Sequence, residues 1–368
     1  MDYISNTTAQ WDRPAAPFRK ELAMDYEYDI IVYIGRFQPF HVGHRAVLDT
    51  ALTKAKRVVV VLGSANCARS PKNPFTHQER AAMISAAYAG NERIVFVPQE
   101  DHLYNFDRWL TEVAAKVSGV ANHPWTPGPI KIGIIGVDKD HTSFYLRHFP
   151  QWEAIPFKPE RLINATDIRR VYFGVLDNLP LHDGMNELPP AIIGWLNSFH
   201  NQQAQTYNFI ADEWRFIDGY KEQWKSAPYP PTFLTADALV TQAGHVLMVA
   251  RAAEPGRGLL ALPGGFVDQS ETMREAALRE LKEETQIRVP SAVLEGRIVG
   301  EQTFDSPERS QRGRTVTHVV HITLDEDKLP KVRGGDDARS ARWVPLADLR
   351  RDQTFEDHYD IIETMTGI

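Results

Sequence analysis

The sequence predicts two domains: an α/β domain built on a parallel sheet, followed by a smaller α+β domain. Three observations support this prediction. The length of 368 residues exceeds that of a typical single domain. The first half alternates short apolar runs with segments of helical period, as α/β proteins do. A proline cluster at 227–231 then separates this half from one in which strand patterns surround a helix pattern.

The first expected element is a buried strand at 29–35, because this run is almost continuously apolar and ends at Gly35. The following elements, by the same criteria, are helix 44–56, strand 57–63, helix 78–89, strand 94–98, helix 109–118 and strand 131–137. Buried strands joined by helices form a parallel sheet with helices on both faces. Ligands bind such sheets beyond the carboxyl ends of the strands, where Gly35, Gly63 and Gly136 fall.

The segment 191–224 is aromatic, polar and helical in period, so we interpret 191–230 as a helical linker. Beyond it we expect strands 233–240 and 245–250 around a turn at Gln242-Ala243-Gly244, a helix at 271–284 and a strand at 315–324. The expected division is a flexible extension at 1–27, a first domain at 28–190, the linker at 191–230 and a second domain at 231–368.

Composition restricts the class of protein. A formal net charge of −7 argues against non-specific binding to nucleic acid. The sequence contains no apolar run long enough for a membrane span, and 1–25 lacks the apolar core of a signal peptide. The single cysteine, Cys67, excludes an intramolecular disulfide and favours a reducing compartment, so we expect a cytoplasmic protein. The oligomeric state stays open, a homo-oligomer included.

The strongest pattern lies at 264–287. Gly264 and Gly265 form a tight loop, Ser270 is a candidate N-cap, and the following helix carries three glutamates, Glu280, Glu283 and Glu284. Their spacing places the three carboxylates on one side of the helix. Crowded carboxylates repel one another unless a hard cation lies between them, which suits Mg²⁺ or Mn²⁺. For a bare glutamate pair, a solvated helix face is the usual alternative.

The spacing from Gly265 through Glu271 to Arg279-Glu280 and Glu283-Glu284 resembles the Nudix box. The resemblance implies Glu280, Glu283 and Glu284 as metal ligands, with Glu283 taken as the one that assists water activation. It implies Gly264, Gly265, Glu271 and Arg279 as support, Arg279 through a salt bridge. The chain departs from the family at Gln286, where glycine normally ends the helix.

The stretch 304–314 is similar to the segment of Nudix domains that handle ADP-ribose, and its arginines can fork onto phosphates. The resemblance implies ADP-ribose as substrate, giving AMP and ribose 5-phosphate. The implied ligands are Arg309, Arg312 and Arg314. A solvated basic loop stays an alternative for each arginine, and a ligand sensor is the alternative for the domain.

The second candidate site lies at 35–44, between the first strand and the first helix. Gly35 permits close approach of a phosphate, and the helix start offers free N–H groups. His41 and His44 are three residues apart and can both face that phosphate. Adenylyl transfer requires alignment and positive charge around phosphorus, which two imidazoles, an arginine and Mg²⁺ would supply. A capping or core role is the alternative for a histidine pair taken alone.

The segment 35–44, at a strand-to-helix turn, resembles the signature of the Rossmann-like nucleotidyltransferase superfamily. The stretch 163–169 is similar to a second element of that family, with Asn164 where serine is common. The resemblance implies His41, His44 and Arg169 as catalytic residues. The ATP-binding residues that it implies are Gly35, Arg36, Phe37, His41, His44, Ile163, Thr166 and Arg169.

Further stretches resemble nicotinamide mononucleotide (NMN) adenylyltransferases fused to a Nudix domain, and this resemblance extends from Asp29 onward. The implied NMN-binding residues are Asn73, Phe75, Tyr104, Asn105 and Trp109. Trp109 would stack on the nicotinamide ring, with a buried aromatic as the alternative. Asp138 and Asp140 are interpreted as acids of the site wall or the scaffold. Nicotinate mononucleotide, pantetheine phosphate and flavin mononucleotide stay open as other acceptors.

Overall fold

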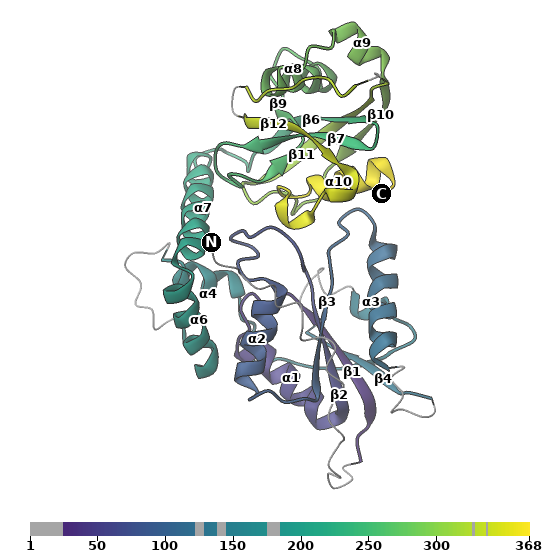
Figure 1. Ribbon diagram of the computed structural model, residues 1–368. Coiled ribbons are helices and arrows are strands. Elements are labelled where there is room, and N and C mark those ends of the chain that lie inside the picture. The colour runs from purple at the N-terminus through teal and green to yellow at the C-terminus, as the bar shows by residue number, and fades with distance from the viewer. Residues whose placement is uncertain (1–24, 122–128, 138–144, 175–184, 326–327, 336–337) are drawn as a thin grey trace, which may run out of the picture.

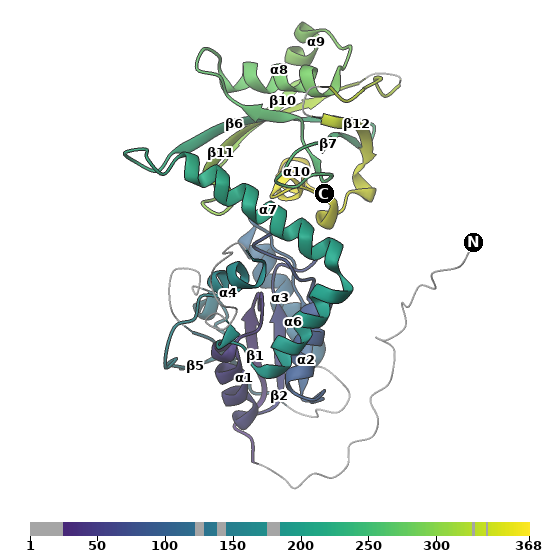
Figure 2. The ribbon, with the colours of Figure 1, turned by 90° about the vertical axis from the view of Figure 1, so that its left-hand side faces the viewer.

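The computed structural model describes residues 25–121, 129–137, 145–174, 185–325, 328–335 and 338–368. Residues 1–24 of the expected extension, and both Asp138 and Asp140, lie outside this part of the chain. Two domains lie end to end, and helix α7 runs along both (Figures 1 and 2). No described helix combines the length and the apolar character needed to cross a membrane.

The N-terminal sheet has five parallel strands in the order β3-β2-β1-β4-β5. They are β1 Tyr28–Gly35, β2 Ala55–Leu62, β3 Ile94–Pro98, β4 Ile132–Ile135 and β5 Glu153–Ile155. The register pairs Gly35 with Leu62 and Leu62 with Pro98, so the carboxyl ends of three strands meet at one edge. The prediction of a parallel α/β sheet is confirmed.

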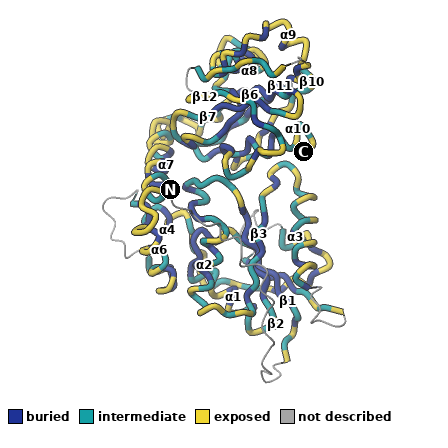
Figure 3. The backbone as a smooth tube through the Cα atoms, viewed as in Figure 1, coloured by how far each residue is buried: buried dark blue, intermediate teal, exposed yellow. Residues whose placement is uncertain are grey.

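Helices cover both faces of this sheet because alternate strand residues point to opposite sides. On one side, Ile31 and Tyr33 pack in a core with α1 (Val42–Lys54), α2 (His77–Ala87) and α4 (Ala165–Tyr172). On the other side, Ile30, Val32 and Ile34 pack with α3 (Phe106–Ala121). Figure 3 shows that buried residues concentrate in the strands.

The segment expected to be a linker is helical, but it is more than a connection. Helix α6 (Pro190–Gln202) packs on α2, and Leu196 and Phe199 belong to the N-terminal core. Helix α7 (Ala204–Gln223) adds Ile210 and Trp214 to the same core. The N-terminal domain therefore extends well beyond residue 190.

The C-terminal domain is a mixed sheet in the order β10-β11-β6-β7-β12, with β8 pairing β7 and β9 pairing β6. The strands are β6 Thr232–Gln242, β7 His245–Arg251, β8 Leu260–Ala261, β9 Gly264–Phe266, β10 Ile298–Phe304, β11 Arg314–Thr323 and β12 Ala338–Pro345. The helices are α8 Met273–Thr285, α9 Ser291–Gly296 and α10 His358–Thr366, with short 3₁₀ turns at Leu346–Asp348 and Arg351–Gln353. The expected β6–β7 hairpin is present, and its turn residues Ala243 and Gly244 have φ of 48° and 72°.

Polar contacts join the two domains. The Tyr104 hydroxyl donates to Asp357 Oδ2 at 2.5 Å, and the Leu103 N–H donates to Asp360. Buried His102 lies between Glu112 of its own domain, at 3.1 Å, and Glu363 of α10, at 3.3 Å. These contacts fix the loop that follows β3 against α10.

Candidate active sites

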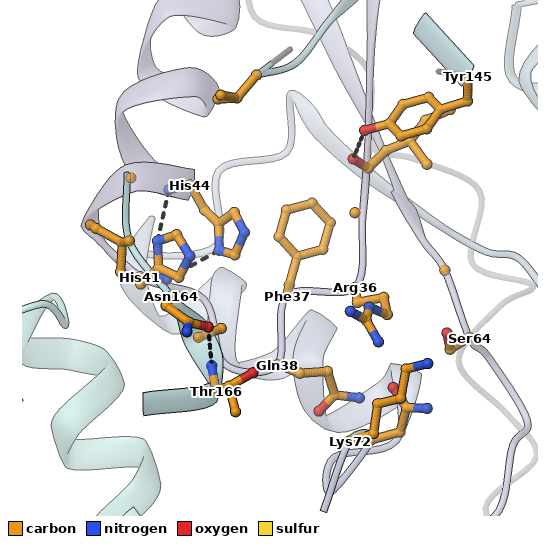
Figure 4. A pocket seen from close by; sticks show the side chains of 18 of the residues that line it. Arg36, Phe37, Gln38, His41, His44, Ser64, Lys72, Tyr145, Asn164 and Thr166 are labelled. Carbon is orange, nitrogen blue, oxygen red and sulfur yellow. Dashed lines mark hydrogen bonds between the residues drawn. The ribbon is translucent and has the colours of Figure 1, made fainter. Parts of the chain in front are cut away.

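A cavity of about 820 Å³ opens at the carboxyl ends of the N-terminal strands, where the alternation of strands and helices places a ligand site. Its wall includes the loop that follows β1, the start of α1 and the start of α4 (Figure 4). The predicted ATP-site residues that line it are Gly35, Arg36, Phe37, His41, His44, Ile163, Thr166 and Arg169. The structure therefore brings this whole predicted group together.

His41 and His44 cap helix α1 reciprocally. The N–H of His44 donates to Nδ1 of His41, and the N–H of His41 donates to Nδ1 of His44, both at 3.3 Å. The two rings stack with centroids 3.6 Å apart. Since each Nδ1 accepts a backbone proton, the neutral rings carry their own proton on Nε2, which is then a donor. The capping alternative and the phosphate-donor hypothesis are thus compatible.

Phe37 determines the conformation of the loop that follows β1. Its backbone is left-handed with φ 51°, and its ring lies beneath Gly35. A Cβ on Gly35 would be 2.8 Å from that ring, so glycine is required there. Gln38, which the sequence interpretation missed, fixes the loop by a two-way hydrogen bond with the backbone of Phe75.

Arg169 lies at the cavity wall, but its donors serve the protein. It donates to the carbonyls of Pro71 and Gln38, both at 2.8 Å, and to the Thr166 hydroxyl at 3.2 Å. Burial lowers the pKa of Arg169 to about 9. Asn164 caps α4 by accepting the Thr166 N–H at 3.0 Å, so this replacement for the common serine keeps the capping role.

The predicted NMN-binding residues divide into two groups. Asn73 and Trp109 line the cavity, and the buried Oδ1 of Asn73 has no hydrogen-bond partner among the described residues. Trp109 stacks on Phe106 with centroids 5.8 Å apart.

Phe75, Tyr104 and Asn105 do not line the cavity. Phe75 is 2% exposed in the hydrophobic core, and Asn105 caps the start of α3 through the Arg108 N–H. Tyr104 faces the other domain, where it packs on Phe304. The structure thus does not bring these three residues to the cavity, and each has a contact within the protein.

Buried Arg80 organises the cavity loops. Its guanidinium donates to the carbonyls of Arg36, Gly63 and Ser64, and burial lowers its pKa to about 10. Ser64 in turn donates to Asp101 at 2.5 Å. The sequence interpretation assigned no role to these residues, because nothing in a linear pattern shows which carbonyls a buried arginine reaches.

In the C-terminal domain, helix α8 starts after Thr272, not after Ser270 as expected. Thr272 and Glu275 form a reciprocal capping box, which satisfies two backbone N–H groups at once. The helix ends at Thr285, and the C-cap residue Gln286 is left-handed with φ 48°. This is the position where the Nudix family usually has glycine, as the sequence suggested.

Arg279 binds Glu271 with two hydrogen bonds, of 3.0 and 2.7 Å. Its Nη1 also contacts Glu280 at 2.8 Å and Glu283 at 2.9 Å. A Cβ on Gly265 would be 2.3 Å from Glu280 Oε1, so the glycine lets the loop approach this carboxylate. The box residues therefore form one connected unit.

Glu284 and Glu280 are half-buried, whereas Glu283 is exposed. Glu284 accepts the Gly264 N–H at 3.0 Å. Burial, together with the charges of Glu280 and Asp237, raises the pKa of Glu284 to about 8. Such gathered negative charge fits a divalent cation, although among the described residues no three acidic, histidine or cysteine side chains are yet arranged to hold one.

A second cavity, of about 170 Å³, lies beside this group. Glu284, Arg309, Arg312, Glu356 and His358 are among its lining residues, whereas Glu280, Glu283 and Arg314 are not. Arg309 is bound by Asp357, and Arg314 contacts Asp305. Arg312 is therefore the predicted ligand best placed for a substrate. Glu356, whose backbone has φ 43°, lines the same cavity, and no sequence motif marks it.

Comparison with known proteins matches each half separately. The cytidylyltransferase-like family model matches residues 32–171, and the NUDIX domain model matches residues 231–365. A nicotinamide/nicotinic acid mononucleotide adenylyltransferase of Acinetobacter baylyi is 36% identical over 198 residues, covering 52% of this chain and 97% of the relative. An ADP-ribose pyrophosphatase of Methanocaldococcus jannaschii is 34% identical over 131 residues, covering 35% of this chain and 70% of the relative.

A solved structure matches both halves together. The bifunctional NMN adenylyltransferase/ADP ribose pyrophosphatase of Francisella tularensis, complexed with AMP and a manganese ion, has a TM-score of 0.82 and 34% identity. The alignment covers 92% of this chain and 99% of that one. This chain therefore belongs to the family of bifunctional NMN adenylyltransferase/ADP-ribose pyrophosphatases.

Proposed function

We propose that the N-terminal domain transfers the adenylyl group of ATP to NMN, giving NAD and pyrophosphate. A phosphate oxygen of NMN attacks the α-phosphorus of ATP, the bond from that phosphorus to the bridging oxygen breaks, and pyrophosphate leaves. The proposal rests on the His41–His44 pair at the N-terminus of α1, where each Nδ1 accepts a backbone N–H. Each Nε2 can then donate to a phosphate oxygen as charge develops.

Other residues supply alignment and charge. The start of α4, capped by Asn164, offers backbone N–H groups to the leaving phosphates. Arg36 and Lys72 add two cations to the same cavity (Figure 4). Asn73, through its unpaired Oδ1, and Trp109, through its ring, are the proposed contacts of the nicotinamide end. Arg169 acts by holding the loops that carry these groups.

For the C-terminal domain we propose hydrolysis of ADP-ribose to AMP and ribose 5-phosphate. Water attacks one phosphorus of the diphosphate, and the bridging oxygen leaves with the other phosphate. Glu280, Glu283 and Glu284 would hold Mg²⁺ or Mn²⁺, which neutralises the diphosphate and lowers the pKa of an attacking water. Arg312 would orient the substrate over this group, and Glu283 would assist deprotonation of the water.

The experiment is to incubate the pure full-length protein with Mg²⁺, ATP and either NMN or nicotinate mononucleotide, and separately with ADP-ribose, and to separate the products. Both acceptors belong in the test because the name of the Acinetobacter relative includes both. Failure to form a dinucleotide from either acceptor would refute the first proposal. Unchanged ADP-ribose cleavage by the Glu280→Gln, Glu284→Gln variant would refute the second.

A ligand sensor is separated from a hydrolase by the Glu283→Gln, Glu284→Gln variant. If the domain is a sensor, the wild type binds ADP-ribose without hydrolysing it, and the variant can keep this binding. If the domain is an enzyme, the wild type hydrolyses ADP-ribose and the variant does not. The single cysteine and the nucleotide substrates together support a cytoplasmic enzyme as part of the proposal.

A further inference from the structure

Among the described residues, the N-terminal cavity has one lining residue from the other domain. Glu308 lies on the 305–313 loop between β10 and β11, and it lines that cavity. The next residue, Arg309, lines the C-terminal cavity instead. Consecutive residues of one turn thus face the two proposed sites.

Glu308 reaches the cavity through Lys72. The Lys72 Nζ lies 2.7 Å from Glu308 Oε2, across 236 positions of sequence. Lys72 is 30% exposed and Glu308 is 54% exposed, so the pair is accessible to solvent and to a ligand. Figure 4 shows Lys72 and Arg36 among the residues that line the cavity.

The neighbouring part of this turn is fixed by contacts with residues of both domains. Arg309 binds both oxygens of Asp357, and Asp357 accepts the hydroxyl of Tyr104 from the N-terminal domain. Glu308 therefore approaches Lys72 from a fixed position. Its carboxylate competes with any phosphate that binds the same ammonium group.

We propose that Glu308 is a positioning residue of the adenylyltransferase cavity, by which the C-terminal domain sets how strongly Lys72 attracts a phosphorylated substrate. The proposal rests on the proposed function only in taking that substrate to be ATP or NMN. Exposed ion pairs are weak, so releasing Lys72 should tighten binding about two- to fivefold. The effect on substrate binding should be the same before and during the chemical step, because Glu308 acts through Lys72 and not on the reacting atoms.

The test is titration calorimetry of ATP with Mg²⁺, and of NMN, into the wild type and Glu308→Gln. We expect the dissociation constant of one of the two ligands to fall two- to fivefold, and kcat for NAD formation to stay unchanged. Asp305→Asn is the matched control, because Asp305 is an exposed acid of the same loop that is not at the cavity. It should leave both dissociation constants unchanged.

Lys72→Met should weaken the same ligand, and adding Glu308→Gln to it should have no further effect, because the two residues act through one contact. Unchanged binding of both ligands by Glu308→Gln would overturn the inference, as would an equal effect of Asp305→Asn. A wild type that binds both nucleotides but forms no NAD would refute the proposed function and leave the inference standing. A wild type that binds neither would refute both.

Discussion

The guanidinium of Arg309 binds both carboxylate oxygens of Asp357 at 2.9 Å, and both side chains are 3% exposed. The pair lies between the domains, because Tyr104 donates to the same carboxylate. Arg309 therefore has a structural role, because its guanidinium is already bound by Asp357. This relationship separates Arg309 from Arg312, which the sequence placed in one group.

Arg309→Ala should therefore lower the free energy of unfolding by about 3–5 kcal/mol, because it leaves Asp357 buried without its countercharge. Arg312→Ala should change stability little and should raise KM for ADP-ribose. Urea denaturation and hydrolysis kinetics on both variants test this. A stable Arg309→Ala protein with a high KM would restore Arg309 as a substrate ligand.

His41→Asn should keep the α1 cap and lose adenylyl transfer. The asparagine Oδ1 can accept the His44 N–H as Nδ1 does, but it offers no donor at the position of Nε2. We expect kcat to fall about 100-fold or more, with the melting temperature nearly unchanged. His41→Ala should lose the cap as well, at about 1 kcal/mol. Equal activity in His41→Asn and the wild type would exclude the imidazole from catalysis.

Glu284 predicts how stability depends on pH in the absence of divalent metal. Its pKa is about 8 in the folded protein, against 4.5 for an ordinary glutamate. Between these values the folded state holds a proton that the unfolded chain has lost, so the free energy of unfolding falls as pH rises. Asp237, with a pKa raised to about 6 by burial, contributes in the same direction.

The measurement is the melting temperature of the metal-free protein from pH 5 to pH 8.5. Glu284→Gln should decline less steeply than the wild type. Because a bound cation favours the charged carboxylate, added Mg²⁺ should stabilise the wild type more at pH 8 than at pH 6. A wild-type profile parallel to that of the variant would contradict the assignment.

Gly265→Ala should impair hydrolysis more than folding. The new Cβ would be 2.3 Å from Glu280 Oε1, which is the end of a movable side chain, so Glu280 must shift. Gly296→Ala is the matched control, since a Cβ there meets nothing within 4 Å. We expect a large loss of kcat/KM for ADP-ribose in the first variant and none in the second, with NAD formation unchanged in both.

Gln286→Gly should stabilise the protein by about 1 kcal/mol. Gln286 caps the C-terminus of α8 in a left-handed conformation, which costs any residue with a Cβ. Chemical denaturation of the variant is the measurement, with ADP-ribose hydrolysis retained. A destabilised variant would mean that contacts of the Gln286 side chain near Gly334 outweigh the backbone strain.

The strands and helices around the first site could be predicted because the apolar pattern within each segment indicates which of its residues are buried. The run 94–98 predicts β3 with the observed bounds, since continuous apolar residues are what a strand covered on both faces requires. The 191–224 segment was harder. Its helical period is visible, but only three-dimensional packing shows that Leu196 and Trp214 complete the core of the first domain.

The site residues divide by the same logic. Residues at a strand end or a helix start, such as Gly35, His41 and Asn164, have positions that the local pattern fixes. Phe75 and Tyr104 lie in loops, where the direction of a side chain depends on partners far away in sequence. Tyr104 is paired with Asp357, 253 positions later, and no linear pattern shows that contact.

Helix α7 belongs to both halves of the molecule. Trp214 is part of the N-terminal core, while the neighbouring Glu213 is 2% exposed and accepts the Gly256 N–H from the C-terminal domain. The proline cluster is thus not a boundary between two independent folding units. A protease cut or a gene fusion there would separate α7 from the C-terminal domain that it contacts. A shortened hydrolase beginning at Thr232 would leave the 252–258 loop without its anchor, so independent production of that half calls for a start upstream of α7.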